Sequence, residues 1–233
     1  GVGGPNGPYR QSERGAVYQA VLDRLPAYPC TCTRADVRAA SDAPHEGQTE
    51  SRYPGTCREG PTRPDSPPAW RLRVPDGEFS ILDLIHGRVT ENVQATTGDF
   101  VLRRADGAWA YHLAVVADDR AMNVTHVLRG EDLLSSGPRQ AALHALLGWP
   151  QPTYTHVPLM RDYQGQRLAK RNGAPSVAQL RRQGANPQQL VADLARSLGW
   201  PVGQTATATD LIGMVGPWIE RERQQHERGN AGG

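Results

Sequence analysis

Three cysteines in the first quarter of the chain have the spacing of metal ligands. Cys30 and Cys32 are separated by one residue, and Cys57 comes 25 residues later at the end of a Tyr-Pro-Gly-Thr-Cys turn. Two thiolates at this spacing can face one ion, and a third can help to close the tetrahedral shell that zinc prefers. The odd number of cysteines argues against a disulfide framework and for a reduced metal site. His45 and Tyr53 are the candidates for the fourth ligand, and chemistry favours His45, because imidazole is a common zinc ligand.

Lys170 is a second residue whose type indicates chemistry. It is the only lysine among the 26 lysines and arginines of the chain. The two types replace each other at most solvated positions, but only lysine brings a compact charge on a flexible stem to a phosphate. Lys170 lies in the glycine-containing run Gln166-Arg-Leu-Ala-Lys-Arg-Asn-Gly-Ala174, which indicates a loop that grips a polyphosphate. A solvated basic loop is the competing interpretation.

Tyr111 and Arg129 could bind an acidic substrate. Arg129 follows a predicted strand at 124–128, and an arginine at the carboxyl end of a strand in an α/β sheet can hold a carboxylate through two hydrogen bonds. Tyr111 could donate a hydrogen bond to the same ligand. Taken without other context, the residues favour a structural pairing of Arg129 with Glu131 or Asp132.

The elements that must position these residues form an α/β pattern followed by helices. Alternating or β-branched runs predict strands at 70–74, 78–82, 99–103, 124–128 and 154–157, and the apolar run 111–116 could be strand or helix. Capping residues and apolar spacing predict helices at 12–25, 136–148, 176–182, 186–199 and 210–223. Residues 28–68 show little periodicity and cannot bury a core unaided, so we expect an insertion that the metal holds together.

Composition limits the classes of function without selecting one. The 233 residues carry a net charge of +2, which permits a nucleic-acid partner only if the arginines gather on one face. No run approaches the ~20 continuous apolar residues of a membrane-spanning helix. The first residues lack the basic and apolar regions of a signal peptide, and the chain has no initiator Met. We therefore expect the start to be a cut through a longer chain.

Several motifs together resemble the class I glutamyl-tRNA synthetase family. The run Leu128-Arg-Gly-Glu-Asp-Leu-Leu-Ser-Ser-Gly-Pro-Arg-Gln140 is similar to the crossover that follows that family's amino-acid site. The run Arg167-Leu-Ala-Lys-Arg171 is similar to its second signature, the Lys-Met-Ser-Lys-Ser loop, and Tyr154-Thr-His-Val-Pro-Leu159 precedes it as expected. Further similar segments are Gly98-Asp-Phe-Val-Leu-Arg-Arg-Ala-Asp-Gly107 and Tyr9-Arg-Gln-Ser-Glu-Arg14, so the likeness extends from residue 9 to about residue 200.

The resemblance implies an incomplete Rossmann-like α/β catalytic domain with a zinc-binding insertion and a small C-terminal helical domain. The corresponding ranges are 1–27 and 69–175 for the catalytic domain, 28–68 for the insertion, 176–226 for the helical domain and 227–233 for a disordered tail. It also implies that Tyr111 and Arg129 bind glutamate. Lys170 would contact ATP and act in catalysis, within the signature loop Arg167, Leu168, Ala169, Lys170 and Arg171.

Within the family, the pattern Cys30, Cys32, Tyr53, Cys57 resembles the zinc site of the glutamyl-Q tRNA(Asp) synthetase branch. This likeness favours Tyr53 over His45 as the fourth ligand. It implies that glutamate is activated by ATP with Mg²⁺ and that the glutamyl group passes to queuosine of tRNA(Asp). We further expect a cytoplasmic protein that acts as a monomer without a membrane partner.

Two departures from the family pattern bear on activity. The first ATP signature, of His-Ile-Gly-His type, is absent, and His45-Glu-Gly-Gln48 is not a substitute because no strand precedes it. We therefore expect the chain as given to be inactive alone. In the second signature, Arg167 and Ala169 replace a lysine and a serine. The alternatives are the catalytic part of an ordinary glutamyl-tRNA synthetase acting on tRNA(Glu), and a non-catalytic RNA-binding module stapled by zinc.

Overall fold

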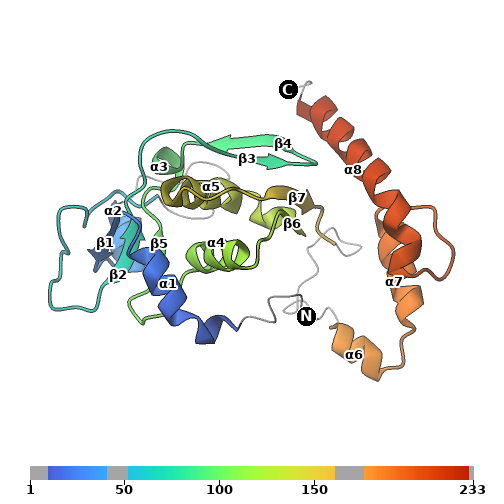
Figure 1. The fold of residues 1–233 in the computed structure, drawn as a ribbon, viewed down its shortest axis with the longest axis horizontal. Coiled ribbons are helices and arrows are strands. Elements are labelled where there is room, and N and C mark those ends of the chain that lie inside the picture. The colour runs from blue at the N-terminus through green and yellow to red at the C-terminus, as the bar shows by residue number, and fades with distance from the viewer. Residues whose placement is uncertain (1–9, 41–51, 161–175, 231–233) are drawn as a thin grey trace. The chain divides into compact units, whose positions relative to one another are not determined.

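The computed structural model describes residues 10–40, 52–160 and 176–230 (Figure 1). The chain divides into two compact units, each described here by itself. The first comprises Gly1–Asp83, Arg88–Val127 and Leu133–Tyr154, and the second comprises Leu84–Gly87, Leu128–Asp132 and Thr155–Gly233. Because each unit combines several segments, residues far apart in the sequence meet within it.

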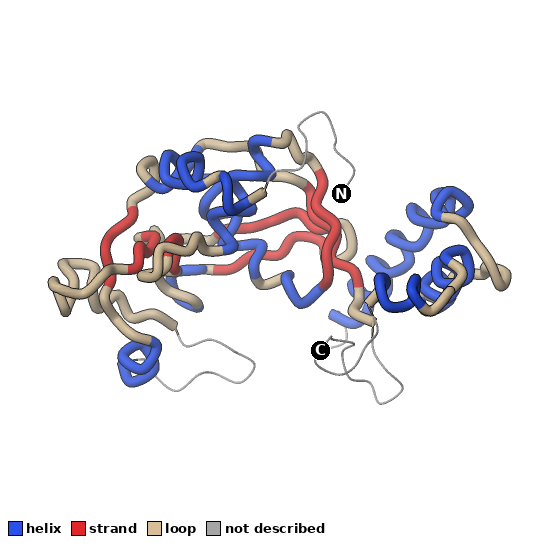
Figure 2. The backbone as a smooth tube through the Cα atoms, turned by 90° about the horizontal axis from the view of Figure 1, so that it is seen from below, coloured by secondary structure: helices blue, strands red, loops and turns tan. Residues whose placement is uncertain are grey.

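Strands and helices alternate through the first two thirds of the chain (Figure 2). The strands are β1 (Ala27–Cys30), β2 (Ala69–Leu72), β3 (Phe79–Asp83), β4 (Gly87–Glu91), β5 (Val101–Arg103), β6 (His126–Gly130) and β7 (Thr153–Val157). The helices are η1 (Gln11–Glu13), α1 (Gly15–Leu22), α2 (Arg34–Ala40), α3 (Val93–Thr96), α4 (Tyr111–Ala121), η2 (Glu131–Leu133), α5 (Ser136–Leu147), α6 (Val177–Arg182), α7 (Pro187–Ser197) and α8 (Ala208–Asn230).

A small antiparallel sheet carries the cysteine segment. Its strand order is β1-β2-β5, and the register pairs Tyr28 with Arg71 and Cys30 with Ala69. Strand β1 alternates in burial, so that Tyr28 and Cys30 are buried while Ala27 and Pro29 are half-buried. Cys30 therefore ends a strand whose partner is fixed by a hydrogen-bonded ladder, which gives the first thiol a defined position.

The second sheet has the order β4-β3-β7-β6, and β3 runs parallel to β7 with Asp83 opposite Tyr154. Parallel pairing requires a crossover with helices on the sheet. Helix α5 supplies one such cover. A Cβ atom on Gly137, in its first turn, would lie 2.4 Å from Cδ1 of Ile81 on β3, so a larger residue there would force the Ile81 side chain to move.

Helices α1, α4 and α5 build the main core of the first unit against β2 and β5. Its fully buried members include Tyr18, Leu72, Leu102, Leu113 and Leu143. The run 111–116 is therefore the start of a helix, because the buried residues of α4 repeat at helical spacing and extend to residue 118.

A buried ion pair ties α1 to α4 within this core. Arg14 donates from Nε to Asp118 at 2.6 Å, and the Tyr18 hydroxyl donates to the same carboxylate at 2.8 Å. A buried carboxylate needs such partners, since an isolated buried charge is very costly.

The second unit contains the helices of the C-terminal part. Ser176 caps α6 and Asn186 caps α7 through their side chains, as the sequence predicts. Trp200 and Trp218 pack edge to face with ring centroids 6.1 Å apart. The expected tail is wrong in part, because α8 continues to Asn230 and makes residues 227–230 helical. The last three residues lie outside the described ranges.

Candidate functional site

The three cysteines converge on one point in the first unit. Their Sγ atoms all lie within 4.8 Å of one another, and those of Cys32 and Cys57 are 3.5 Å apart. The Tyr53 hydroxyl lies 3.3 Å from Sγ of Cys30 and 3.8 Å from that of Cys32. Zn–S bonds of ~2.3 Å place the sulfurs of a tetrahedral site about 3.8 Å apart. The spacing and the soft donor set therefore fit a zinc ion.

Backbone contacts with Thr97 and Gly98 hold Tyr53 at this cluster. The backbone N–H of Tyr53 donates to the Thr97 carbonyl at 3.0 Å, and Tyr53 forms an isolated bridge with Gly98. Gly98 has φ of +71°, and a Cβ atom there would lie 2.2 Å from the Tyr53 carbonyl oxygen. Glycine is thus required both by the left-handed backbone and by the contact.

The phenol oxygen of Tyr53 receives a hydrogen bond from the chain itself. The backbone N–H of Cys57 donates to it at 2.9 Å. Burial raises the pKa of the Tyr53 phenol, so this group is protonated until a cation displaces the proton. Burial alone would also raise the pKa of Cys57, but backbone hydrogen bonds at Thr62 and Thr31 lower it to about 6. Burial raises the pKa of Cys32 to about 11.

Arg71 compensates the negative charge that three thiolates and a phenolate would carry. Its Nε donates to Sγ of Cys30 at 3.2 Å, and its guanidinium lies over the Tyr53 ring at 3.8 Å from the centroid. A further nitrogen donates to the Asp99 carbonyl at 2.8 Å. Groups of this kind around a metal orient its ligands and tune its affinity.

Asp99 anchors the cysteine segment to β2 and β5. Arg58 donates to both carboxylate oxygens at 2.6 Å, the Tyr28 hydroxyl donates at 2.5 Å and the Val74 backbone N–H at 2.9 Å. Although burial opposes ionisation, these four hydrogen bonds hold the pKa of Asp99 below its ordinary value. The carboxylate therefore stays charged and, through Arg58, fixes the position of the segment that follows Cys57.

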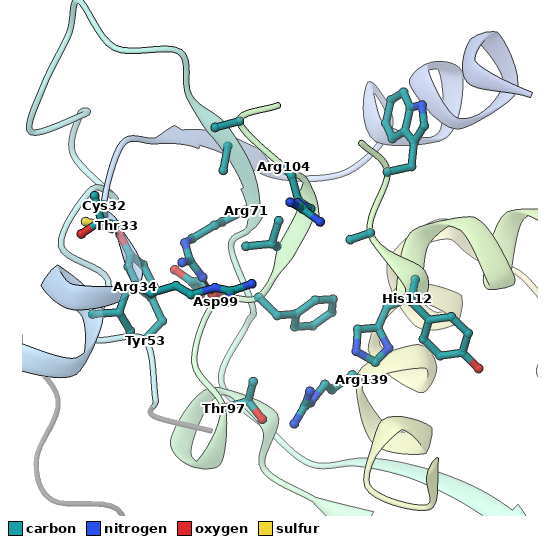
Figure 3. Close-up of a pocket in the computed structure, with 18 of the residues that line it drawn as sticks. Cys32, Thr33, Arg34, Tyr53, Arg71, Thr97, Asp99, Arg104, His112 and Arg139 are labelled. Carbon is teal, nitrogen blue, oxygen red and sulfur yellow. Dashed lines mark hydrogen bonds between the residues drawn. The ribbon is translucent and has the colours of Figure 1, made fainter. Parts of the chain in front are cut away.

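A pocket of about 1000 Å³ adjoins the cysteine cluster in the first unit (Figure 3). Residues of α2, β2, β5 and the starts of α4 and α5 line it, and Cys32, Tyr53 and Arg71 form the wall nearest the cluster. Tyr111 belongs to the same lining and is 46% exposed. The expected substrate-binding tyrosine and two of the expected metal ligands, Cys32 and Tyr53, thus border one cavity.

Of the other expected site residues, the structure describes Arg129 but not the loop that contains Lys170. Arg129 lies on β6 in the second unit, where its Nε donates to Nε2 of the buried His156 at 2.9 Å. Lys170 and the rest of its loop, Arg167 to Arg171, lie outside the described residues, as does His45.

Sequence reasoning missed the basic lining of the pocket and the role of Arg71. A signal for the lining was present, because Arg34 and Arg38 are four residues apart and would share a face of any helix there. The remaining pocket arginines come from distant segments, and no local pattern connects them.

Residues 3–227 match the model of the catalytic domain of class I tRNA synthetases for Glu and Gln. The chain belongs to this family. The α/β fold with a parallel strand pair and a separate helical part is that of the family's catalytic domain, which confirms the expected fold class. Family membership identifies the protein as a ligase of the glutamyl-tRNA synthetase type.

Curated relatives of the synthetase family place the chain close to one branch. A "Glutamyl-Q tRNA(Asp) synthetase" from Deinococcus radiodurans is 49% identical over 217 residues, which are 89% of this chain and 73% of that protein. Another of the same name from Nitratidesulfovibrio vulgaris is 47% identical over 92% of this chain and 70% of its own. This agreement confirms the branch that the cysteine and tyrosine pattern indicates.

Solved synthetase structures show the same fold at greater distance. A glutamate-tRNA synthetase from Elizabethkingia anophelis has a TM-score of 0.58 at 28% identity, and a glutamate tRNA ligase from Elizabethkingia meningosepticum, in complex with its amino acid, has 0.57 at 30%. They cover 73% and 74% of this chain, which spans 38% of each of them. Among the described helices of this synthetase, none is long and apolar enough to cross a membrane.

Proposed function

We propose that this protein activates glutamate with ATP and Mg²⁺ and transfers the glutamyl group to queuosine in tRNA(Asp). The observation that carries the proposal is that relatives at 49% and 47% identity, from Deinococcus radiodurans and Nitratidesulfovibrio vulgaris, bear the name glutamyl-Q tRNA(Asp) synthetase. The convergence of Cys30, Cys32 and Cys57 with Tyr53 supports the same branch, because its resemblance rests on that set.

The first step joins a glutamate carboxylate oxygen to the α-phosphorus of ATP and breaks the bond to the β-phosphate, so that pyrophosphate leaves. In this proposal Lys170 contacts the phosphates, and its ammonium offsets the negative charge that develops there. Arg129 holds a substrate carboxylate, and Tyr111 donates a hydrogen bond to the ligand. The exposed position of Tyr111 on the pocket lining supports its part in this scheme.

The second step joins the activated glutamyl carbonyl to a hydroxyl oxygen of queuosine and releases AMP. The nucleophile is weak until it is held close to the carbonyl, so positioning of the RNA supplies much of the rate. Zinc, held by Cys30, Cys32, Cys57 and Tyr53, has a structural role in this scheme. It orders a segment with no large core of its own, beside the pocket.

Charging of tRNA(Glu) at its 3′ end is the second candidate, and the likeness to the two Elizabethkingia structures favours it. Both candidates share the activation step and differ only in the acceptor. The test is glutamylation by the full-length gene product of three RNAs: tRNA(Asp) with queuosine, tRNA(Asp) with unmodified guanosine, and tRNA(Glu). Charging confined to the queuosine form supports the proposal, and charging confined to tRNA(Glu) overturns it.

A further inference from the structure

Arginines dominate the wall of the pocket beside the cysteine cluster. The five that line it are Arg34, Arg38, Arg71, Arg104 and Arg139. Asp99 is the one acidic side chain among the described residues of the lining, and Arg58 neutralises it through two hydrogen bonds of 2.6 Å. Arg104 pairs with Asp106 at the surface, 2.6 Å apart.

Arg34 and Arg38 form the least compensated part of this wall. Both are exposed on α2, and neither makes a hydrogen bond or ion pair with any residue in the described ranges. Residues four apart lie on one face of a helix, and like charges so placed repel each other. Such a pair is best accommodated where an anion comes between or alongside the two cations.

The charges extend across the cavity and are not confined to one corner. Figure 3 shows Arg34 on the side of Cys32 and Thr33, Arg139 and His112 on the opposite side, and Arg71 and Arg104 between them. One small anion could satisfy only part of this row. A chain of regularly spaced phosphates could contact both ends at once, and arginine suits phosphate because its donors are arranged as a planar fork.

We propose that this pocket binds the phosphodiester backbone of a single-stranded RNA loop, with Arg34 and Arg38 contacting phosphates that flank the acceptor nucleoside. The inference rests on the proposed function, which supplies an acceptor in an RNA loop. Proteins recognise RNA mostly at loops of this kind, where the bases are unstacked. Because Tyr111 borders the same cavity, an RNA strand held by α2 would bring its acceptor nucleoside toward the glutamate end.

The test measures binding of the tRNA(Asp) anticodon stem-loop to the full-length protein at a series of salt concentrations. Each phosphate contact with a single strand contributes about −0.7 to the slope of log K against log salt. Arg34→Ala/Arg38→Ala should therefore reduce the magnitude of the slope by about 1.4. One exposed ion pair contributes at most ~1 kcal/mol, which corresponds to about fivefold in affinity. Because two contacts are lost, the affinity near 0.1 M salt should fall about fivefold or more.

Arg120→Ala is the matched control. Arg120 is also exposed, but it lies at the end of α4 opposite Tyr111 and does not line the pocket. Its loss should leave the slope within error of the unaltered protein. Arg34→Lys/Arg38→Lys should restore the slope, since each lysine keeps the charge. An unaltered slope in the double alanine variant, or an equal loss in Arg120→Ala, overturns the inference.

Two further measurements separate this inference from other readings. Phosphate groups also occur in ATP, so the Michaelis constant for ATP is measured by glutamate-dependent pyrophosphate exchange without RNA. A raised constant in the double variant, with unaltered RNA binding, would assign the arginines to the nucleotide and overturn the inference.

The same binding series with tRNA(Glu) separates failure of the proposed acceptor from failure of RNA binding in the pocket. If the protein charges only tRNA(Glu), and the double variant still reduces the salt slope for binding of tRNA(Glu), the proposed acceptor is refuted. The same result supports RNA binding in the pocket.

Discussion

The guanidinium of Arg71 lies over the ring of Tyr53, with 3.8 Å between its carbon and the ring centroid. The same side chain donates to Cys30, so one cation contacts two of the four expected zinc ligands. A cation over an aromatic face is attracted by the ring, and the attraction grows when the phenol ionises. This relationship gives a physical reason for a tyrosine in a position where histidine is the commoner ligand.

Replacing Tyr53 by Phe should weaken zinc binding, because the ring packing remains while the ligand oxygen is lost. Residues around a metal already change its affinity by about tenfold to a hundredfold, and loss of a direct ligand should exceed the lower figure of ~10. The measurement is metal content after dialysis against a chelator of graded strength. Cys32→Ser should lose zinc as well, whereas His45→Ala should retain it. Undiminished zinc in Cys32→Ser would refute the site.

Gly98→Ala should disrupt the cysteine cluster. The added Cβ would meet the Tyr53 carbonyl oxygen at 2.2 Å, so the backbone that positions Tyr53 must shift. Gly148→Ala is the matched control, since Gly148 has a similar φ of +66° and open space around it. The control should cost ~1–2 kcal/mol of stability from the left-handed backbone alone. Gly98→Ala should cost more and should also lower zinc content, and equal effects of the two changes would contradict the account.

Asp99→Asn should destabilise the first unit. The Asp99 side chain is 0% exposed and that of its partner Arg58 is 28% exposed, so the loss should be at most the ~3–5 kcal/mol that removing one partner of a fully buried pair costs. Asp106→Asn is the control, because its pair with Arg104 is 53% and 60% exposed and should contribute below ~1 kcal/mol. Urea unfolding of both variants measures the difference.

The contribution of Asp99 should also depend on pH. Its pKa is lower in the folded chain than in the unfolded chain, where an ordinary carboxyl titrates near ~3.9. Its stabilisation is therefore fully present above about pH 4 and is lost as the pH falls through the folded pKa. The stability difference between the unaltered protein and Asp99→Asn should shrink below about pH 4, and a constant difference would refute this assignment.

Arg129→Ala should raise the Michaelis constant for glutamate in the full-length protein. A charged hydrogen bond contributes ~1.5–3 kcal/mol, which corresponds to about tenfold to a hundredfold. Arg129→Lys should be impaired as well, because a point charge replaces the fork. If Arg129 only positions His156, to which it donates at 2.9 Å, the constant for glutamate should stay near its unaltered value.

Lys170→Ala should slow glutamate-dependent pyrophosphate exchange by about tenfold to a hundredfold, using ~1.5–3 kcal/mol for one charged contact to phosphate. Lys170→Arg should also be slower, since guanidinium does not reproduce the compact ammonium. Arg171→Ala tests the alternative of a generally basic loop. Equal effects at Lys170 and Arg171 would support that alternative.

The convergence of the three cysteines could be predicted from sequence because the signal is local. Cys30 ends strand β1, Cys32 follows two residues later, and the turn at Tyr53 to Cys57 supplies the third thiol, so the spacing indicates convergence. Residue types alone do not select Tyr53 as the expected fourth ligand. Its suitability depends on the hydrogen bond from the Cys57 N–H and on Arg71, which lies on another strand. These tertiary contacts support Tyr53 as the fourth ligand, and no local pattern in the sequence reveals them.

The features that sequence analysis missed or placed wrongly have no local apolar pattern and depend on contacts with other residues. Strand β4, Gly87-Arg-Val-Thr-Glu91, has a single apolar residue and depends on its neighbours in the sheet. Helix α8 runs beyond its expected end because Arg223 pairs with Glu220 and lies 4.0 Å from Glu227, which supports an exposed helix that has little apolar periodicity there. The basic pocket was missed since its residues come from four separate segments.

The most direct test of the proposed activity is the position of the glutamyl group on the RNA. Queuosine-containing tRNA(Asp) that lacks its 3′-terminal adenosine is incubated with the full-length protein, ATP, Mg²⁺ and labelled glutamate, and is then cut into fragments. The account predicts label in the anticodon fragment, at a level equal to that of intact tRNA(Asp). Label that requires the terminal adenosine, or that is found only at the 3′ end, would contradict it.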